Sequence, residues 1–589
     1  MRPVLPTSTA TTTPTATATQ LPTPAATATA TPTAIPTPTA TQTIPPTPTP
    51  TPHPLAHSLI AFSARIDNNW DIYAVDPATG ARIRLTADPA EDRFPAFSPD
   101  GKQLAFASKR NGYWNLYLRS CDGMILPITN QDAYVGAPAW SPDGLKLAYE
   151  SMQDGNLDIW LFDIPGAGTF TNLTADSLRA DGMPAWSPDG TQIAFTSWRN
   201  GDADLFVLNL ETGETRQATS MSTDEELLGW HNDTLLYSLI DGEKQDVYAR
   251  PVDADPESPG TRLTRWNVVS TATASPNGDH LAYLLRYTHG TRLLVQQITG
   301  EWDLPAYLSE DLVIGGPLSW ASTQVDWPEA HGDPLVLYEE KTSPGHGSPY
   351  DMVRIEGVDV GNPWLSDRAN DSFIALRQRT IDECGRDFFA QLSDAWRDIG
   401  YDSGYSSYTS WHKTGRAIDT LLDYLSPDHS KRWLEVVLEP GGGEVYWRLY
   451  LYCANQDGSQ GMPLRTRPWD LTADARQALT GGRRKALPTG YYVDLTDLMA
   501  QYGWLRIAAH DSPDFHWHNN FIAVEHWHFQ KTDELLWYDA MLEVFEPALV
   551  EQYHRWEIQQ EKGMPLWLTV AKGIPVPRRE RKWLDRIVP

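Results

Sequence analysis

A motif that recurs along residues 57–325 constrains the fold more than any other feature of the chain. Its clearest copies read FPAFSPDGKQLAFAS from Phe94, APAWSPDGLKLAYES from Ala137 and MPAWSPDGTQIAFTS from Met183. Weaker copies surround Trp230 and residues 274 and 320, so that equivalent positions are 43 to 46 residues apart. Short alternating apolar runs separated by Pro-Asp-Gly or Asn-Gly are typical of strands joined by hairpins. A period in the forties with four such strands predicts β-propeller blades.

The two ends of the array complement each other. The first unit, LIAFSARIDNNWDIYAVDPATGARIRLT, lacks the motif strand, and the last unit, GPLSWAS, contains little else. Joined, they make one blade, which with five whole units predicts six blades in a ring without an open sheet edge. The repeats resemble the six-bladed TolB-type propeller, and we assign residues 56–328 to this all-β domain. The aspartates of the SPDG copies stand where turns require them.

The propeller resemblance implies a fold and no activity. The repeats contain no constellation of catalytic residues, so we expect a binding or scaffold module, and the sequence does not identify its ligand.

The first 55 residues have a different composition. Residues 3–54 are nearly all Thr, Pro and Ala, with almost nothing to bury, which predicts a disordered stalk or linker over residues 1–55. Thr/Pro-rich stalks commonly hold domains off a cell surface. We therefore expect an extracellular or cell-surface protein, although Met1–Pro6 shows no signal-peptide pattern. A plain interdomain linker is the alternative.

Charge and cysteine content exclude several classes of function. The formal net charge of −29 disfavours a nucleic-acid partner, because phosphate binding needs a positive field. No run of about 20 apolar residues is present, so we expect no transmembrane segment. The three cysteines, Cys121, Cys384 and Cys453, are far apart and exclude a disulfide framework or a cysteine-ligated zinc.

A second, α+β domain is predicted over residues 333–589, where the period has ended. The spacing of apolar residues predicts a helix over 371–384, closed by Gly385. Strands are expected over 432–440, 445–454, 503–510 and 519–530, and helices over 532–560.

The functional prediction depends mainly on the string SWHKTGRAID, residues 410–419. It matches the pattern S-x-H-x-x-G-x-A-x-D and resembles the zinc peptidases that include D-Ala-D-Ala carboxypeptidases and dipeptidases, whose fold is shared with the hedgehog signalling domain. The resemblance implies that His412 and Asp419 bind zinc. It also implies that VEHWHF, residues 524–529, supplies the third ligand His528 and the catalytic acid/base Glu525. Three other histidines remain rivals for the third ligand: His516, His518 and His526.

The same family uses a cationic residue to stabilise the oxyanion, and LSDAWRD offers Arg397 for this role. The later string SGYSS has Ser406 where the arginine would stand. An exposed charge on a helix is the alternative reading of Arg397. Unchanged turnover after loss of Arg397 would move the role to Arg377, Arg379 or Arg416.

Together these features predict a multidomain surface protein with a zinc-dependent peptidase domain. The family's usual substrates imply a D,D- or L,D-carboxypeptidase or endopeptidase acting on peptidoglycan-type stem peptides. A non-catalytic, zinc-containing recognition protein is the alternative, and a purely structural surface protein would bind no metal.

Overall fold

The structure is a computed structural model that describes residues 55–582 apart from 165–168, 288–289, 299–304, 324, 342–351, 402–408, 442, 471–483 and 513–514. The predicted stalk, residues 1–55, lies outside the described residues except for Leu55. The described residues all belong to one compact unit, His53–Pro589. No helix among the residues described has both the length and the apolar character needed to cross a membrane.

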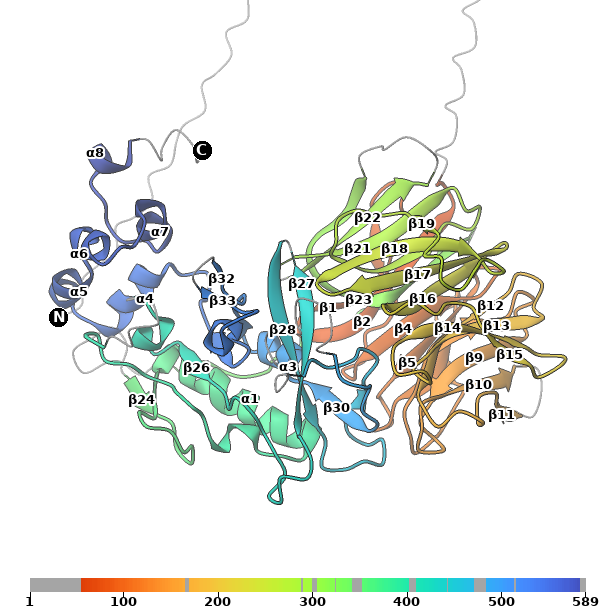
Figure 1. The fold of residues 1–589 in the computed structure, drawn as a ribbon, viewed down its shortest axis with the longest axis horizontal. Helices are drawn as coiled ribbons and strands as arrows, with labels where there is room; N and C mark the ends of the chain where they lie inside the picture. Colours follow the sequence, from red (N-terminus) through yellow and green to blue (C-terminus); the bar gives the residue numbers. More distant parts are fainter. Residues whose placement is uncertain are drawn as a thin grey trace, which may run out of the picture. The chain divides into compact units, whose positions relative to one another are not determined.

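Residues 58–322 form antiparallel sheets that resemble the blades of a β-propeller (Figure 1). Four of these sheets have four strands each, which lie side by side in chain order. Their strands are β4 (Asp92–Phe97), β5 (Gln103–Ser108), β6 (Asn115–Ser120) and β7 (Ile125–Pro127); β8 (Val135–Trp140), β9 (Lys146–Ser151), β10 (Asp158–Asp163) and β11 (Phe170–Asn172); β12 (Asp181–Trp186), β13 (Gln192–Ser197), β14 (Asp204–Asn209) and β15 (Thr215–Gln217); β16 (Asp224–His231), β17 (Thr234–Asp241), β18 (Lys244–Pro251) and β19 (Thr261–Arg262).

A seven-stranded sheet joins the two ends of the array, in the order β20-β21-β22-β23-β1-β2-β3. Its strands are β20 (Val269–Ala274), β21 (His280–Arg286), β22 (Thr291–Gln297), β23 (Ala306–Ser322), β1 (Ser58–Ile66), β2 (Asn69–Val75) and β3 (Arg82–Arg84). The first part of β23 pairs with β22, and its second part pairs with β1. The first part of β23 completes a four-stranded blade with β20, β21 and β22, and its second part completes another with β1, β2 and β3. With the four sheets above, these two blades give the predicted six. The split blade is therefore assembled from both ends of the array, as its sequence predicts.

The aspartates of the repeated SPDG motif stabilise turns. In three copies the serine hydroxyl donates to the aspartate two residues later, with O–O distances of 2.6, 2.6 and 2.7 Å for Ser98, Ser141 and Ser187. The glycine that follows has a positive φ, which is 67° at Gly101. These contacts agree with the turn-forming role expected from the sequence.

The chain after the propeller forms a mixed α/β region. Its elements are β24 (Met352–Arg354), β25 (Trp364–Ser366), α1 (Asp367–Cys384), η1 (Phe388–Ala390), η2 (Trp411–Thr414), β26 (Ala417–Asp419), β27 (Leu434–Gly441), β28 (Glu444–Tyr452), β29 (Met462–Pro463), β30 (Tyr491–Asp494), α3 (Leu495–Gln501), β31 (Leu505–Arg506), β32 (Asp511–Ser512), β33 (Phe515–His516), η3 (Phe521–Val524), β34 (His528–Gln530), α4 (Trp537–Val544), α5 (Pro547–His554), α6 (Trp556–Glu561), α7 (Leu566–Ala571) and α8 (Arg578–Arg581). Two sheets matter for the site: β26-β34-β31 and β27-β28-β30-β29.

Two of the strands expected in this region are much shorter than predicted. The predicted helix is present as α1, with Gly385 in the left-handed conformation at its end, and β27 and β28 occupy the first two predicted strands. The expected strand over 503–510 is reduced to β31, and the expected strand over 519–530 begins as the 3-10 helix η3 and becomes β34 only at His528. Asn520 caps η3 by accepting from the Ile522 N–H at 3.0 Å, so a local polar contact competes with strand formation.

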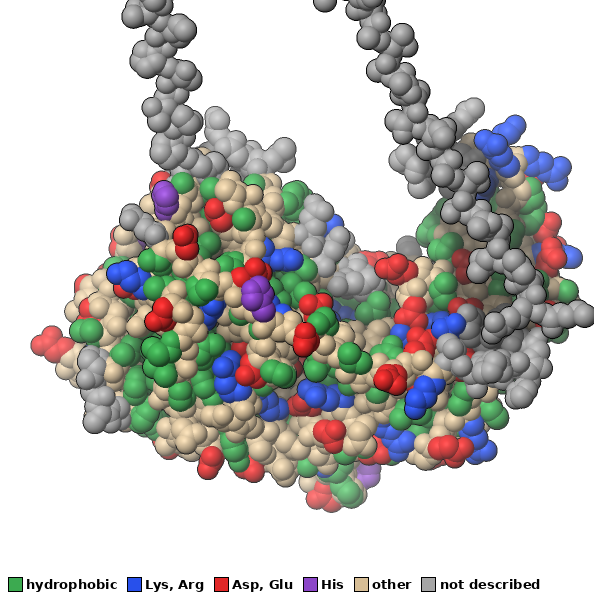
Figure 2. Space-filling model, turned by 180° about the vertical axis from the view of Figure 1, so that it is seen from behind, with side chains coloured by type: hydrophobic (Ala, Val, Ile, Leu, Met, Phe, Trp, Pro, Cys, Tyr) green, Lys and Arg blue, Asp and Glu red, His purple; other side chains and the backbone are tan. Residues whose placement is uncertain are grey.

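The propeller and the C-terminal region share buried contacts. One hydrophobic cluster contains Trp114 and Tyr134 of the propeller together with Phe373 and Trp447 of the C-terminal region. Ion pairs also cross between them, among them Arg465 with Glu150 at 2.6 Å. Acidic and basic side chains are interspersed over the face in Figure 2. The domain boundaries predicted at residues 328 and 333 fall inside the compact unit and stay a prediction.

Candidate metal centre

His412 comes from the tight turn that the motif string forms. Ser410 caps η2 by accepting from the His412 N–H at 3.3 Å, and Gly415 ends this helix with a φ of 68°. A Cβ at Gly415 would lie 2.6 Å from the backbone nitrogen of Ser366, so the motif needs glycine here for both space and conformation. The chain then enters β26, which ends at Asp419.

Strand pairing brings the third residue to the first two. β26 and β34 are antiparallel, and their register sets Asp419 directly opposite His528. Residues opposite each other in such a pair have Cβ atoms about 4.5–5.5 Å apart. The 109-residue separation between these two side chains is therefore closed by a ladder of three residue pairs.

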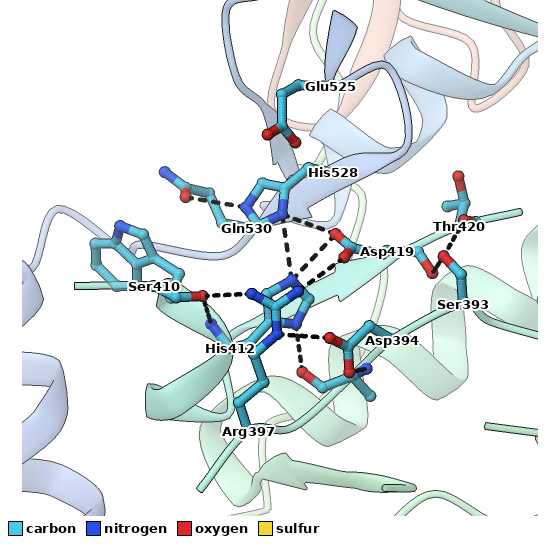
Figure 3. A network of polar contacts seen from close by, with 12 residues as sticks. Ser393, Asp394, Arg397, Ser410, His412, Asp419, Thr420, Glu525, His528 and Gln530 are labelled. Atoms are coloured by element: carbon cyan, nitrogen blue, oxygen red, sulfur yellow. Dashed lines mark hydrogen bonds and ion pairs between the residues drawn. The ribbon is translucent and has the colours of Figure 1, made fainter. Parts of the chain in front are cut away.

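The three ligand atoms converge (Figure 3). Asp419 Oδ1 lies 3.0 Å from His412 Nε2 and 2.8 Å from His528 Nδ1, and the two ring nitrogens are 3.3 Å apart. All three side chains are buried. Among the residues described, these three form the cluster of histidine, cysteine or carboxylate side chains that could hold a metal ion.

The other ring nitrogen of each histidine has a partner outside the cluster. His412 Nδ1 is hydrogen-bonded to the Ala395 carbonyl oxygen, which requires a proton on Nδ1, and this contact orients the ring so that Nε2 faces Asp419. His528 Nε2 lies 3.4 Å from Gln530 Oε1. Such outer contacts orient the imidazoles of metal sites and fix their tautomers.

The electrostatics of the cluster favour an ionised carboxylate. Burial raises the pKa of Asp419, but the charges and hydrogen bonds of His412 and His528 lower it by more. The pKa of Asp419 therefore lies far below its usual range. Burial likewise opposes protonation of His528, and its contact with Asp419 raises the pKa of His528 above its usual value. Two imidazoles and an ionised carboxylate fit a divalent metal ion, and three protein ligands leave a position for water or substrate.

Glu525 lies beside His528 without joining the ligand cluster (Figure 3). It follows η3, and its φ of 55° is unusual for a residue with a side chain. A regular strand over residues 519–530 would put Glu525 and His528, three positions apart, on opposite faces. The structure instead puts Glu525 in the turn between η3 and β34, so its side chain is not bound to strand alternation.

Arg397 lies at the cluster. Its Nε donates to Asp394 Oδ2 at 2.6 Å, and its Nη2 approaches Asp419 Oδ2 at 3.4 Å. Its backbone N–H donates to the His412 carbonyl at 3.3 Å, and no helix contains it, so the alternative of an exposed helix charge does not hold. Ser406 lies outside the described residues.

The other candidate arginines have partners elsewhere. Arg416 is ion-paired with Asp533 and Glu543, Arg377 with Asp387, and Arg379 with Glu383.

The rival histidines do not join the cluster. His526 Nε2 is hydrogen-bonded to the Leu422 carbonyl, and burial lowers the pKa of His526 to about 4. His516 pairs with Asp511, and His518 with Glu243 of the propeller.

Sequence reasoning missed His510, whose Nε2 lies 3.4 Å from Glu525 Oε1. It also missed Asp394 as the partner of Arg397. His510 is 15 residues from Glu525 and belongs to no motif, so only the fold brings the two together.

Comparison with protein-family models supports the propeller. The family model of the TolB beta propeller domain matches residues 123–309, a stretch that ends before the candidate metal centre. TolB from Acinetobacter baumannii is 21% identical with a TM-score of 0.40, over 45% of this chain and 66% of its own. A prolyl endopeptidase is 17% identical with a TM-score of 0.30, over 43% of this chain and 43% of its own. A puromycin-hydrolyzing peptidase of Mycobacterium tuberculosis is 15% identical with a TM-score of 0.30, over 41% of this chain and 43% of its own. Among curated proteins, none matches the sequence.

Proposed function

We propose that the C-terminal region is a zinc-dependent peptidase. The observation that carries this proposal is the buried convergence of His412, Asp419 and His528, with a glutamate beside the third residue. Nitrogen and oxygen donors of this kind are preferred by zinc, and a three-ligand site is the arrangement of catalytic zinc. The S-x-H-x-x-G-x-A-x-D string adds the resemblance to D-Ala-D-Ala peptidases, and stem peptides of the peptidoglycan type are the proposed substrates.

The roles of the surrounding residues follow from their positions. Bound zinc would polarise the scissile carbonyl and lower the pKa of its water toward about 7. Glu525 would accept the proton of the attacking water and return it to the leaving amine. Arg397, held between Asp394 and Asp419, would donate to the oxygen that becomes negative as the carbonyl is attacked.

We also propose an extracellular or cell-surface location. Its support is the Thr/Pro-rich composition of residues 3–54 together with the proposed peptidoglycan substrate. We propose no nucleic-acid partner, because the net charge of −29 would repel phosphate groups.

The test is hydrolysis by the full chain loaded with zinc, on a panel of stem peptides with D,D- and L,D-linked ends. Glu525→Gln should retain zinc and lower turnover by about 10²–10⁴-fold, the usual contribution of a general acid–base. Glu534→Gln, at an exposed glutamate nearby in sequence, is the matched control and should leave turnover unchanged. Zinc binding without cleavage of any peptide would instead favour the non-catalytic recognition protein.

A further inference from the structure

A turn of the propeller contacts the segment that carries His510. The turn joins β17 to β18 at residues 241–244, and Glu243 Oε1 within it lies 2.6 Å from His518 Nε2. The neighbouring Gly242 carbonyl accepts from Arg484 Nη2 at 3.0 Å, and Arg484 also pairs with Asp224 of β16 at 2.6 Å. The turn is thus attached to the C-terminal region at two successive residues.

The pairing of β32 with β33 and a backbone hydrogen bond beside it fix His518 relative to His510. The Trp517 N–H donates to the His510 carbonyl at 3.0 Å, and the rings of Trp517 and His518 stack with centroids 3.9 Å apart. Trp517 is buried and makes edge-to-face contacts with Trp447 and Trp469 of the core. A displacement of His518 would therefore be transmitted to the backbone of His510.

His510 in turn borders the segment that ends at Glu525. Its backbone N–H donates to the Ala523 carbonyl at 2.8 Å, and its Nε2 lies 3.4 Å from Glu525 Oε1. Glu525 has a left-handed backbone conformation, which for a residue with a side chain persists only when its surroundings hold it. Two contacts of His510, one to the backbone of Ala523 and one to the Glu525 carboxylate, therefore help to hold Glu525.

We propose that Glu243 of the propeller is a positioning residue for Glu525, acting through the contacts of His518, Trp517 and His510. The propeller would then be part of the catalytic machinery, since one of its turns sets the place of the catalytic glutamate. The catalytic half of this proposal rests on the proposed function, whereas the coupling of the turn to the hairpin does not. Errors of about 1 Å in the placement of a reacting group can cost up to about a hundredfold in rate.

The competing explanation is an ion pair without consequence. The side chains of Glu243 and His518 are 38% and 22% exposed, and exposed pairs of this kind often contribute little to stability. A change in melting temperature would therefore not separate the two explanations. The local mobility of residues 509–524 and the division of the effect between kcat and KM would.

The experiment uses the full chain loaded with zinc and compares Glu243→Ala with Glu211→Ala, which alters an exposed glutamate in another propeller turn. Zinc content, kcat and KM on a stem peptide, and hydrogen exchange of residues 509–524 are measured for each. We expect Glu243→Ala to retain zinc, to lower kcat about tenfold with little change in KM, and to speed exchange in 509–524. Glu243→Gln, which keeps a hydrogen-bond acceptor, should recover part of both losses, and Glu211→Ala should match the wild type.

Other results would overturn the proposal. Wild-type kcat and exchange in Glu243→Ala would show that the contact holds nothing. Faster exchange with unchanged kcat would show that the turn holds the hairpin without positioning Glu525. If the wild type cleaves no peptide, the proposed function fails, and the exchange of residues 509–524 alone decides whether Glu243 holds this segment.

Discussion

Removal of the Arg465 guanidinium should destabilise the protein far more than an ordinary surface substitution. Arg465 donates to Glu150 Oε2 through both Nε, at 3.1 Å, and Nη2, at 2.6 Å, and the Glu150 side chain has no exposed surface. In Arg465→Met, Glu150 would keep the Met183 N–H at 2.7 Å and the Tyr134 hydroxyl at 3.3 Å, but no cation. Breaking a buried ion pair in this way costs about 3–5 kcal/mol.

The assay is urea denaturation of the full chain followed by tryptophan fluorescence. Arg465→Met should lower the free energy of unfolding by about 3–5 kcal/mol, since the charge of Glu150 stays buried without its partner. Adding Glu150→Gln removes that charge, so the double variant should be more stable than Arg465→Met. A cost below about 1 kcal/mol for Arg465→Met, or strictly additive costs of the two substitutions, would refute a buried pair between propeller and C-terminal region.

Two further predictions concern Arg397 and Glu225. Arg397→Ala should retain zinc and lower turnover on stem peptides about a hundredfold, as expected for loss of one oxyanion-stabilising donor, and unchanged turnover would remove Arg397 from the mechanism. Burial, with a smaller contribution from the negative charges of Asp204 and Asp224, raises the pKa of Glu225 to about 8 from a usual 4.5. The contribution of protonated Glu225 to stability is therefore full below about pH 4.5 and is lost as the pH rises toward 8. In metal-free protein, the melting temperature should fall less between pH 5 and 8 in Glu225→Gln than in wild type. Equal changes of melting temperature with pH in the two proteins would contradict this.

The parts of the fold that sequence predicts are those encoded by local repetition. Each SPDG copy contains its own turn contacts, such as Ser98 with Asp100, so the blade pattern can be seen before any long-range contact is known. The split blade follows from what the first and last units lack. The pairing that completes it, β1 with β23, joins residues 248 to 264 positions apart, yet the requirement for a closed ring makes it predictable.

The residues of the candidate site can be predicted from sequence where they lie in motifs. His412 and Asp419 are seven residues apart in one string, and the family resemblance adds Glu525 and His528. The conformation around Glu525 was not predictable from alternation, because the Asn520 cap and a positive φ replace the expected strand.

The contacts of Glu243 and Arg465 were hidden for another reason. A charged residue in a turn or loop has the sequence pattern of a solvated surface group, and nothing local marks its partner in another part of the chain.

The metal content of the full chain tests the proposed zinc site most directly. After saturation with zinc and removal of the excess, wild type, His516→Ala and His518→Ala should each hold one zinc per chain. His412→Ala, Asp419→Ala and His528→Ala should each hold none, because three ligands leave no redundancy. Zinc retained by His528→Ala but lost from His516→Ala or His518→Ala, or a wild type that binds no zinc, would contradict the account.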